Sequence, residues 1–534
     1  MNKLYLLFFM SILANCDAMN EKDLIAGRKK NRGEESEKWE WERGNSRLIE
    51  RIGYPVFDIS GYPVFDITAY GALPNNSTLC SSSIQAAIDA AFTAGGGIVY
   101  VPPGGAFLTA TISLRNNVYL HLPAGATIQG SSVLQDYVSV NGGNWDKWDV
   151  VHTKNASNTG IFGNGGVLQG PMWQLIDHYD PVQNQLIPKT FANGQYGCIG
   201  ECRPRLLVFE DCENVLVQGI QLFDSADWTQ LYRRVVNVTL DSLNVVGSQQ
   251  WPNNDGVDFE SCINVTVTNW TSFTGDDGIV FGSGNCNSMR VPWPEPWGNY
   301  TPTKNVLVDG AIISSYSSAI KFEQVFQSWH GDVFNVTLQN IVIHDSARGV
   351  GFQQRTGGGK IYNVLVKDVA VLRTKAVTGS NWWGAGEALW ITTLPEEDSS
   401  SNSSLGGIDS IVFTNVYLEG EQGAILINRG QGDATDEKLT GLLFENTTVV
   451  IGIYGNATRP GVHDLRPVSQ GEQILSANVT GFWMEGVLGA VIQNSAVIFN
   501  GQKQPFWEPP PGCVGLTQDS TVRVVGMNCV RPSL

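Results

Sequence analysis

Basic residues are scarce in this 534-residue sequence: 34 lysines and arginines face 51 acidic residues, which gives a formal net charge of −17. Recognition of nucleic-acid phosphates requires a basic surface, so this balance argues against a nucleic-acid partner. We expect the acidity to favour solubility instead. Charged residues make up only 16% and hydrophobic residues 42%, values that are typical of a folded chain.

Long apolar runs are also missing. The apolar run from Leu4 to Ala14, after Lys3, is too short to cross a membrane, and no later run is longer. Together with small residues near Ala18 it predicts a signal peptide over residues 1–18. We therefore expect a secreted protein, extracellular or in the cell wall, without a membrane partner.

The sequence also lacks a serine-hydrolase motif and a complete metal-binding cysteine motif. No Gly-x-Ser-x-Gly turn accompanies the six histidines, which argues against a Ser-His-Asp hydrolase. Cys198 and Cys202 are spaced like half of a metal knuckle, but no second half follows, so we expect no metal. Eight cysteines follow the signal peptide, and an even number in an exported chain predicts disulfides. The preferred pair is Cys513 with Cys529, closing a C-terminal loop, and the other pairs stay open.

Three different segments follow the predicted signal peptide: a charged stretch, a repeated heptapeptide and an expected helix. Residues 19–52 are charged and lack apolar periodicity, which indicates a flexible or weakly ordered extension. The heptapeptide Gly53–Ile59 is then repeated at Gly61–Ile67. Three serines, Ser81 to Ser83, precede a helical apolar period that ends before three glycines, so we expect one helix with hydroxyl caps.

A repeat follows this helix. An Asn-Val pair opens a short alternating segment six times, at steps of 23, 27, 41, 30 and 28 residues. Units of this length with Gly, Asn and Asp between them predict the coils of a solenoid rather than the longer blades of a β-propeller. We therefore predict an all-β fold, a single-stranded right-handed parallel β-helix over residues 53–500, capped by the short N-terminal helix. Residues 501–534 are expected to form a C-terminal tail with the disulfide. The repeated asparagines are Asn214, Asn237, Asn264, Asn305, Asn335 and Asn363.

Many Asn-x-Ser/Thr sequons predict a secreted glycoprotein. Three of them, at Asn237, Asn264 and Asn335, lie at the repeat position that other coils fill with asparagines outside sequons. At this position we expect asparagine to serve turn geometry. The remaining sequons include Asn76, Asn155, Asn299, Asn402, Asn446, Asn456 and Asn478.

Three acids carry the predicted chemistry: Asp255, Asp276 and Asp277. Asp255 and Asp276 are 21 residues apart, close to one coil, and one coil advances by only about 4.8 Å. Acids stacked in this way repel one another, which raises at least one pKa and keeps a proton available. One acid to protonate a leaving oxygen and one carboxylate to activate water are what glycoside cleavage requires. Single Asp-Gly pairs are often turns, and acid clusters can bind calcium.

Six stretches of the chain form a family-like pattern: Phe65–Ala72, Gly95–Pro102, Gly163–Gly166, Ser225–Thr229, Asn253–Gly256 and Gly275–Asp277. Through them the chain resembles glycoside hydrolase family 28, the polygalacturonases and rhamnogalacturonases, over roughly residues 64–500. The resemblance implies inversion at the anomeric carbon without a metal or cofactor. It also implies that Asp276 is the general acid while Asp255 and Asp277 hold and activate water.

The chain departs from the polygalacturonase pattern at two places. The family's His-Gly motif is replaced by Ser317–Glu323, and its Arg-Ile-Lys motif by Gly351–Gln353. Loss of both cations argues against plain homogalacturonan, whose carboxylates need charge partners. Four residues remain candidates for substrate contact: Trp228, Lys321, Glu323 and Arg355.

We therefore expect a monomeric secreted enzyme that hydrolyses a cell-wall polysaccharide, most simply a pectic one. Two alternatives remain. A catalytically degenerate β-helix that only binds glycans would explain the missing motifs, and a polysaccharide lyase would use the acids to bind calcium.

Overall fold

A computed structural model gives the structure of the chain, which divides into two units, Met1–Gly53 and Tyr54–Leu534. The predicted signal peptide and charged extension lie outside the described residues. The described residues are 61–138, 148–189, 203–283, 301–324, 331–355, 358–379, 383–394, 405–429, 439–455, 461–466, 474–502, 504–507, 513–516 and 520–530.

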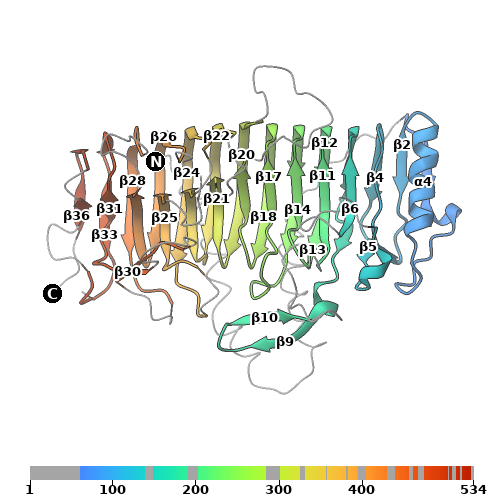
Figure 1. The fold of residues 1–534 in the computed structure, drawn as a ribbon, viewed down its shortest axis with the longest axis horizontal. Coiled ribbons are helices and arrows are strands. Elements are labelled where there is room, and N and C mark those ends of the chain that lie inside the picture. The colour runs from blue at the N-terminus through green and yellow to red at the C-terminus, as the bar shows by residue number, and fades with distance from the viewer. Residues whose placement is uncertain are drawn as a thin grey trace. The chain divides into compact units, whose positions relative to one another are not determined.

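The second unit is a right-handed parallel β-helix, as predicted (Figure 1). The strand register reproduces the repeat: Val215 pairs with Val238, Val238 with Val265, and Val265 with Val306, at the steps that separate the asparagines. Since each pair is parallel and adjacent, one repeat is one coil.

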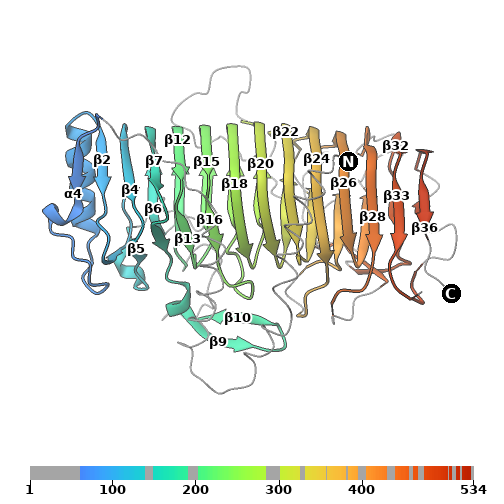
Figure 2. The same cartoon turned by 180° about the vertical axis from the view of Figure 1, so that it is seen from behind.

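Two long parallel sheets form the walls of the coils, with the first to the last coil running from α4 to β36 in both views (Figures 1 and 2). The 11-stranded sheet has the spatial order β6 (Asp149–Lys154), β11 (Arg205–Glu210), β14 (Gln230–Arg233), β17 (Val257–Glu260), β19 (Ile279–Gly282), β21 (Ser318–Gln324), β23 (Arg348–Gln354), β25 (Glu387–Thr393), β27 (Gln422–Asn428), β31 (Phe482–Glu485) and β34 (Val514–Leu516).

The 21-stranded sheet contains the other parallel strands of the described chain. They are β1 (Val64–Asp66), β2 (Gly97–Tyr100), β3 (Gly105–Thr109), β4 (Val118–Leu122), β5 (Ala126–Gly130), β7 (Ser157–Gly163), β8 (Val167–Gln169), β12 (Glu213–Gln218), β13 (Gln221–Phe223), β15 (Val236–Asp241), β16 (Asn244–Val246), β18 (Ile263–Thr274), β20 (Thr303–Ser315), β22 (Val333–His344), β24 (Ile361–Thr374), β26 (Ile408–Gly420), β28 (Leu443–Ile451), β32 (Ala490–Gln493), β33 (Ala496–Phe499), β35 (Val522–Val525) and β36 (Asn528–Val530).

Short elements complete the described chain. Two antiparallel hairpins leave the coils, and three 3₁₀ turns join strands. The hairpins are β9 (Ile176–Asp180) with β10 (Gln185–Pro188), and β29 (Val462–Asp464) with β30 (Ile474–Ser476). The 3₁₀ turns are η2 (Ile67–Tyr70), η3 (Leu134–Asp136) and η4 (Met172–Leu175).

The helix α4 (Ser81–Thr93) lies at the first coil, where it buries Ile84 and Ile88 and so caps the stack (Figure 1). The expected hydroxyl cap is not formed, which corrects the sequence analysis. The helix begins at Ser81, after Cys80, and the Ser81 hydroxyl accepts instead from the amide of Ala110 at 2.8 Å. The hydroxyl therefore ties the helix to the coil below it.

An aromatic stack fills the interior behind the 11-stranded sheet. The ring centroids of Phe259 and Phe281 lie 5.6 Å apart, and those of Phe322 and Phe352 lie 4.4 Å apart. The rings are nearly parallel in both pairs. Each ring sits at the same register position as the next. Such stacking on consecutive coils fixes the heights of β17, β19, β21 and β23, the strands that carry the predicted site.

The repeated asparagines form a hydrogen-bonded ladder along one edge. Each has a left-handed backbone, with φ between 55° and 60° for the six repeat positions, a region in which asparagine is tolerated far better than most residues. Each side-chain amide donates to the carbonyl of the asparagine one coil before; Asn305 Nδ2 donates to Asn264 Oδ1 at 3.0 Å. The prediction that this position serves turn geometry is thus confirmed.

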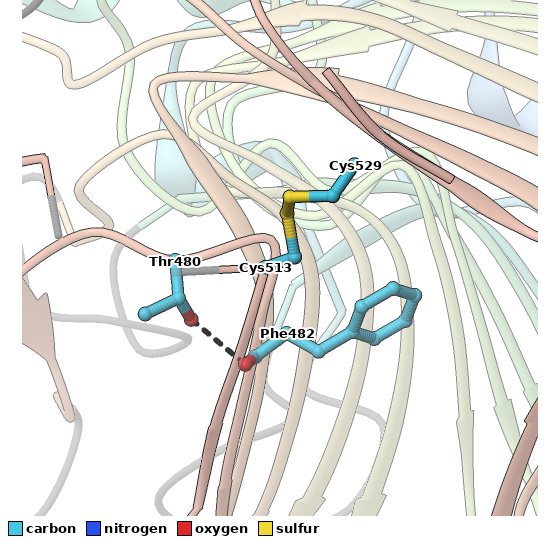
Figure 3. The surroundings of a disulfide bond; sticks show 4 residues. All are labelled: Thr480, Phe482, Cys513 and Cys529. Atoms are coloured by element: carbon cyan, nitrogen blue, oxygen red, sulfur yellow. Dashed lines mark hydrogen bonds between the residues drawn. A yellow bond between two sulfur atoms is a disulfide. The ribbon is translucent and has the colours of Figure 1, made fainter. Parts of the chain in front are cut away.

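The last residues correct the predicted domain boundary. Residues 501–534 were expected to form a tail, but β34 pairs with β31, and β35 and β36 pair with β32 and β33. The solenoid therefore continues through the described strands of this segment, up to Val530. A disulfide joins Cys513 beside β34 to Cys529 in β36, with Cα atoms 6.2 Å apart (Figure 3). This bond links the two walls of the final coil.

The other described cysteines, Cys80, Cys212 and Cys262, are buried thiols. Burial raises the pKa of Cys212 and of Cys262 to about 12, which makes both thiols unreactive at neutral pH. The predicted half-knuckle Cys198 and Cys202 lies outside the described residues. Within the part of the chain that is described, no helix has the length and apolar character needed to cross a membrane.

The ladder makes a prediction about stability. Asn305→Ala should lower the free energy of unfolding by about 1–2 kcal/mol, because alanine resists the left-handed backbone and cannot hydrogen-bond to Asn264 or Asn335. Asn305→Gly, which accepts that backbone freely, should cost less. Urea unfolding of both variants provides the test. Equal losses for alanine and glycine would show that backbone geometry is not what asparagine supplies.

Candidate active site

The three predicted acids lie together where two neighbouring strands begin. Val257 of β17 pairs with Ile279 of β19, so Asp255 and Asp277 occupy the same register position on consecutive coils. A carboxylate oxygen from each of Asp255, Asp276 and Asp277 lies within 4.8 Å of the other two. Asp255 and Asp277 are buried, whereas Asp276 is partly exposed.

One asparagine side chain holds the two turns in register. Asn254 Oδ1 accepts from the amides of Gly275 at 2.7 Å and Asp276 at 3.2 Å, and its Nδ2 donates to the Ser248 carbonyl at 3.0 Å. Gly275 permits this approach, because a Cβ there would lie 2.1 Å from the Trp251 carbonyl oxygen. Hydrogen bonds of the Asn254 side chain therefore connect the Asn-Asn-Asp-Gly sequence to the Gly-Asp-Asp sequence one coil further.

Asp277 is fixed in its ionised form. Its Oδ1 accepts from the Ser318 amide and its Oδ2 from Lys321 Nζ, both at 2.8 Å. Burial opposes ionisation, but the Lys321 ammonium outweighs it and lowers the pKa of Asp277. The same ammonium lies 2.7 Å from Glu323 Oε2. Lys321 is thus a buried cation that forms ion pairs with two carboxylates, those of Asp277 and Glu323.

The pKa of Asp276 is shifted in the opposite direction from that of Asp277. Burial, and then the charge of Asp277, raise the pKa of Asp276 to about 6. The Asp276 side chain accepts through Oδ1 from the Asp277 amide at 3.0 Å. Burial and the neighbouring acids, Asp276 first, also raise the pKa of Asp255 well above its ordinary value. Neighbouring carboxylates therefore differ in protonation, with Asp277 the most acidic.

A fourth acid, Asp258, belongs to the same surface and was not among the predicted site residues. It is buried, and its Oδ2 has no hydrogen-bond partner among the described residues. Burial and then the charge of Glu323 raise the pKa of Asp258 well above normal. The sequence held a signal for it: Asp258 and Glu260 alternate with Val257 and Phe259, so both acids point away from the apolar interior.

The predicted substrate contacts fall in different places. Lys321 and Glu323 lie beside the acids, and the Lys321 ammonium forms ion pairs with Asp277 and Glu323. Their contact with substrate stays a prediction. Trp228 lies one coil from Asp255 in register, half-buried, with the Arg205 guanidinium carbon 4.6 Å from its ring centroid. One face of this indole is thus covered.

Arg355 is not brought to the acids. Ser318, which is next to Asp277 in register, pairs with Arg348 at the start of β23, and Arg355 follows the other end of this strand. Seven extended residues separate the two arginines by roughly 20 Å. The suggestion that Arg355 replaces a lost cation of the Arg-Ile-Lys motif stays a prediction, because Arg355 lies only two residues beyond Gln353, the end of the stretch that replaces this motif.

A family model described as glycosyl hydrolases family 28 matches residues 190–291, the segment that contains all three clustered aspartates. Over this segment the chain is similar to that family. A polygalacturonase from Malus domestica is 25% identical over 203 residues, which cover 33% of this chain and 44% of the relative. An exo-poly-alpha-D-galacturonosidase from Dickeya chrysanthemi is 23% identical over 448 residues, 70% of each chain.

The similarity to curated relatives is partial in length. The chain spans 44% of the Malus protein and 60% of a probable polygalacturonase from Vitis vinifera. Among solved structures, the exopolygalacturonase from Thermotoga maritima matches with a TM-score of 0.57 at 19% identity, covering 90% of this chain and 96% of that one. This match shows that the two chains share the β-helix fold.

The matched segment ends before β21, the strand where this chain differs from the polygalacturonase pattern. Ser318 occupies the place after Asp277 in register, and Lys321 and Glu323 follow on the same strand. One coil further, Gly351 pairs with Lys321 and Gln353 with Glu323. The positions expected for cations on β23 are thus neutral.

The Lys321–Asp277 pair makes a prediction about stability. Lys321→Met should cost about 3–5 kcal/mol at pH 7, because it leaves a buried carboxylate without its cation. The pKa of Asp277 is lowered in the wild type, so its ionised form stabilises the fold above its ordinary pKa and that contribution is lost on acidification. Without Lys321, burial alone raises this pKa. The cost measured by urea unfolding should therefore shrink between pH 7 and pH 4.5.

The matched control is the double variant Lys321→Met/Asp277→Asn, which removes both charges. It should recover part of the stability lost at pH 7. A cost of Lys321→Met that is the same at both pH values and in both backgrounds would contradict the pairing.

Proposed function

We propose that this chain is a secreted glycoside hydrolase that cleaves a pectic cell-wall polysaccharide. The observation that carries the proposal is the divided protonation of clustered acids: Asp276, with a pKa raised to about 6, lies next to Asp277, whose pKa is lowered. Hydrolysis of a glycosidic bond needs one proton donor and one ionised acceptor at the same site. The relation to family 28 supports the same assignment.

The proposed step uses three side chains. Asp276 donates its proton to the glycosidic oxygen as the bond from this oxygen to the anomeric carbon breaks. Asp277, held ionised by Lys321, accepts a proton from the attacking water, and the water oxygen forms the new bond to that carbon. Asp255 helps to hold the water; its raised pKa means that it keeps its proton to a higher pH than Asp277 does, so Asp277 is the acid that is available in ionised form as the base.

Inversion of the anomeric carbon is proposed from the family resemblance. Typical inverting enzymes separate their two carboxyl groups by about 6.5–9.5 Å so that water fits between them. Here the carboxylate oxygens lie within 4.8 Å. Water must therefore enter beside the cluster, next to Asp255 and Asp277, rather than between acid and base.

The proposed substrate is pectic because the relatives include a polygalacturonase and an exo-poly-alpha-D-galacturonosidase. Gly351 and Gln353 stand where two cations were expected, and Lys321 is already neutralised by two acids. As the substrate we therefore favour pectic polymers that carry other sugars over plain homogalacturonan.

One alternative is a calcium-dependent lyase. The three acids present oxygens close enough to ligate one divalent cation. Against this, Lys321 Nζ already occupies Asp277 Oδ2 at 2.8 Å, and a second cation there would be repelled. A glycan-binding protein without activity is the other alternative.

The test is product analysis on a panel of pectic polysaccharides. The wild type should release saturated reducing sugars, and Asp276→Asn should lose on the order of 10²- to 10⁴-fold in rate. Asp89→Asn on helix α4 is the matched control and should retain activity. Unsaturated products, or activity abolished by chelation, would favour the lyase; retention on a polymer without any product would favour the binding protein.

Stereochemistry provides a separate prediction. Proton NMR of the first sugar released should show the anomer of configuration opposite to the bond cleaved, because water displaces the leaving group in a single step. Retention at the earliest times would instead require a covalent intermediate on one of the carboxylates. That result would overturn the role of Asp277 as a base, while leaving hydrolysis itself intact.

A further inference from the structure

Arg203 is a buried cation beside the acids that no sequence pattern indicated. Its side chain is 1% exposed. The guanidinium donates from Nη1 to the Pro252 carbonyl at 2.7 Å and from Nη2 to Asn253 Oδ1 at 2.8 Å, and its carbon lies 5.7 Å from the centre of the Trp251 ring. Arg203 therefore holds the three residues that lead into the Asn-Asp-Gly turn.

Asn253 passes this contact on to Asp276. Its backbone is left-handed, with φ of 58°, and its Nδ2 donates to Asp276 Oδ2 at 3.4 Å. A guanidinium can only donate, so Arg203 requires the carbonyl end of the amide to face it. The amino end must then face Asp276. The orientation of this amide, which is otherwise free to flip, is thus fixed by Arg203.

The charge of Arg203 is shared between the acids and Asp227. The Arg203 guanidinium is attracted to Asp227 first and then to Asp276 and Asp255. Asp227 is 1% exposed. Burial raises its pKa, while Arg203 and Arg205 oppose this. Asp227 thus balances a cation that would otherwise be buried with the catalytic acids alone.

We propose that Arg203 is a positioning residue for the general acid, acting through Asn253 on Asp276. The guanidinium sets the direction of the Asn253 amide, and this amide sets the place of the Asp276 carboxyl. This inference rests on the proposed hydrolase function, because it assigns Asp276 the role of proton donor. Neither Arg203 nor Asp227 touches the reacting atoms in this account.

Any test by pH must consider the other groups that act on Asp276. Asp277 raises its pKa and Lys321 lowers it. Variants at Arg203 leave both of these residues in place, so a change can be assigned to the arginine. The charged groups around the cluster are Asp255, Asp258, Asp277, Lys321, Glu323, Asp227 and Arg205.

The experiment compares three variants with the wild type by steady-state kinetics. Arg203→Met should lower kcat by about 10- to 100-fold with little change in KM, because a misplaced acid slows the chemical step. It should also move the basic limb of the pH profile upward, by up to about one pH unit. Arg203→Lys keeps the charge but cannot make both contacts, so it should lower kcat without moving the limb. Asn253→Ala should behave like Arg203→Lys.

A readout that needs no activity accompanies the kinetics. Infrared difference spectra of wild type minus Asp276→Asn report the protonated carboxyl of Asp276 across a pH titration. Its midpoint should rise in the Arg203→Met background and stay in Arg203→Lys. Since Arg203→Met could fold poorly, Arg203→Met/Asp227→Asn, which removes both buried charges, serves as the second variant.

The outcomes separate the two claims. An unchanged midpoint, together with unchanged kcat per folded molecule, would overturn the inference even if the variants melt earlier. A wild type that releases no product from any polymer would overturn the proposed function, and the infrared midpoint would still decide whether Arg203 acts on Asp276.

Discussion

Parallel pairing between consecutive coils is the constraint on which the rest of this structure depends. It places residues one repeat apart in sequence at neighbouring positions in space, about 4.8 Å from each other. The asparagine ladder, the aromatic stack and the acid cluster are three consequences of the same register. Because the stacked rings fix the heights of β17 and β19 from inside, the acids at the starts of these strands are held close despite their repulsion.

Buried cations decide how that repulsion is resolved. Three acids in one place would each resist ionisation, since burial and like charges act in the same direction. Lys321 makes the acids unequal because its ammonium binds Asp277. Arg203 hydrogen-bonds to Asn253, and Asn253 in turn hydrogen-bonds to Asp276. The result is an ionised carboxylate beside one that keeps its proton, without any change of residue type. The hydrolytic chemistry that we propose follows from this asymmetry.

Much of the fold could be predicted because the repeat is visible in one dimension. The Asn-Val spacing matched the strand register coil by coil. Parallel pairing of β17 with β19, one coil apart at a spacing of its own, brought Asp255 to Asp277. The final coils were missed because residues 501–534 lack that Asn-Val mark, although β34 to β36 continue the pairing. Helix α4 was expected in the right place, but its serine bonds to the first coil, a tertiary contact that local propensity does not reveal.

The site was predictable only where its residues share the repeat. Lys321 and Glu323 were noticed as departures from a motif, yet only the side-chain distances show that they bind each other and Asp277. Arg203 lies 50 residues before Asn253 and outside any periodic pattern, so no spacing connects the two. Arg355 lies near the replaced motif but about seven residues along the strand direction from the register position of Asp277, so its role stays a prediction.

The central claim is that protonation is divided between adjacent acids, and neutron diffraction from crystals at pD near 5 would test it most directly. The account predicts a deuteron on the carboxyl of Asp276 and none on Asp277, with the Lys321 ammonium fully deuterated and directed at Asp277 Oδ2. A deuteron on Asp277, or an Asp276 without one, would contradict the account.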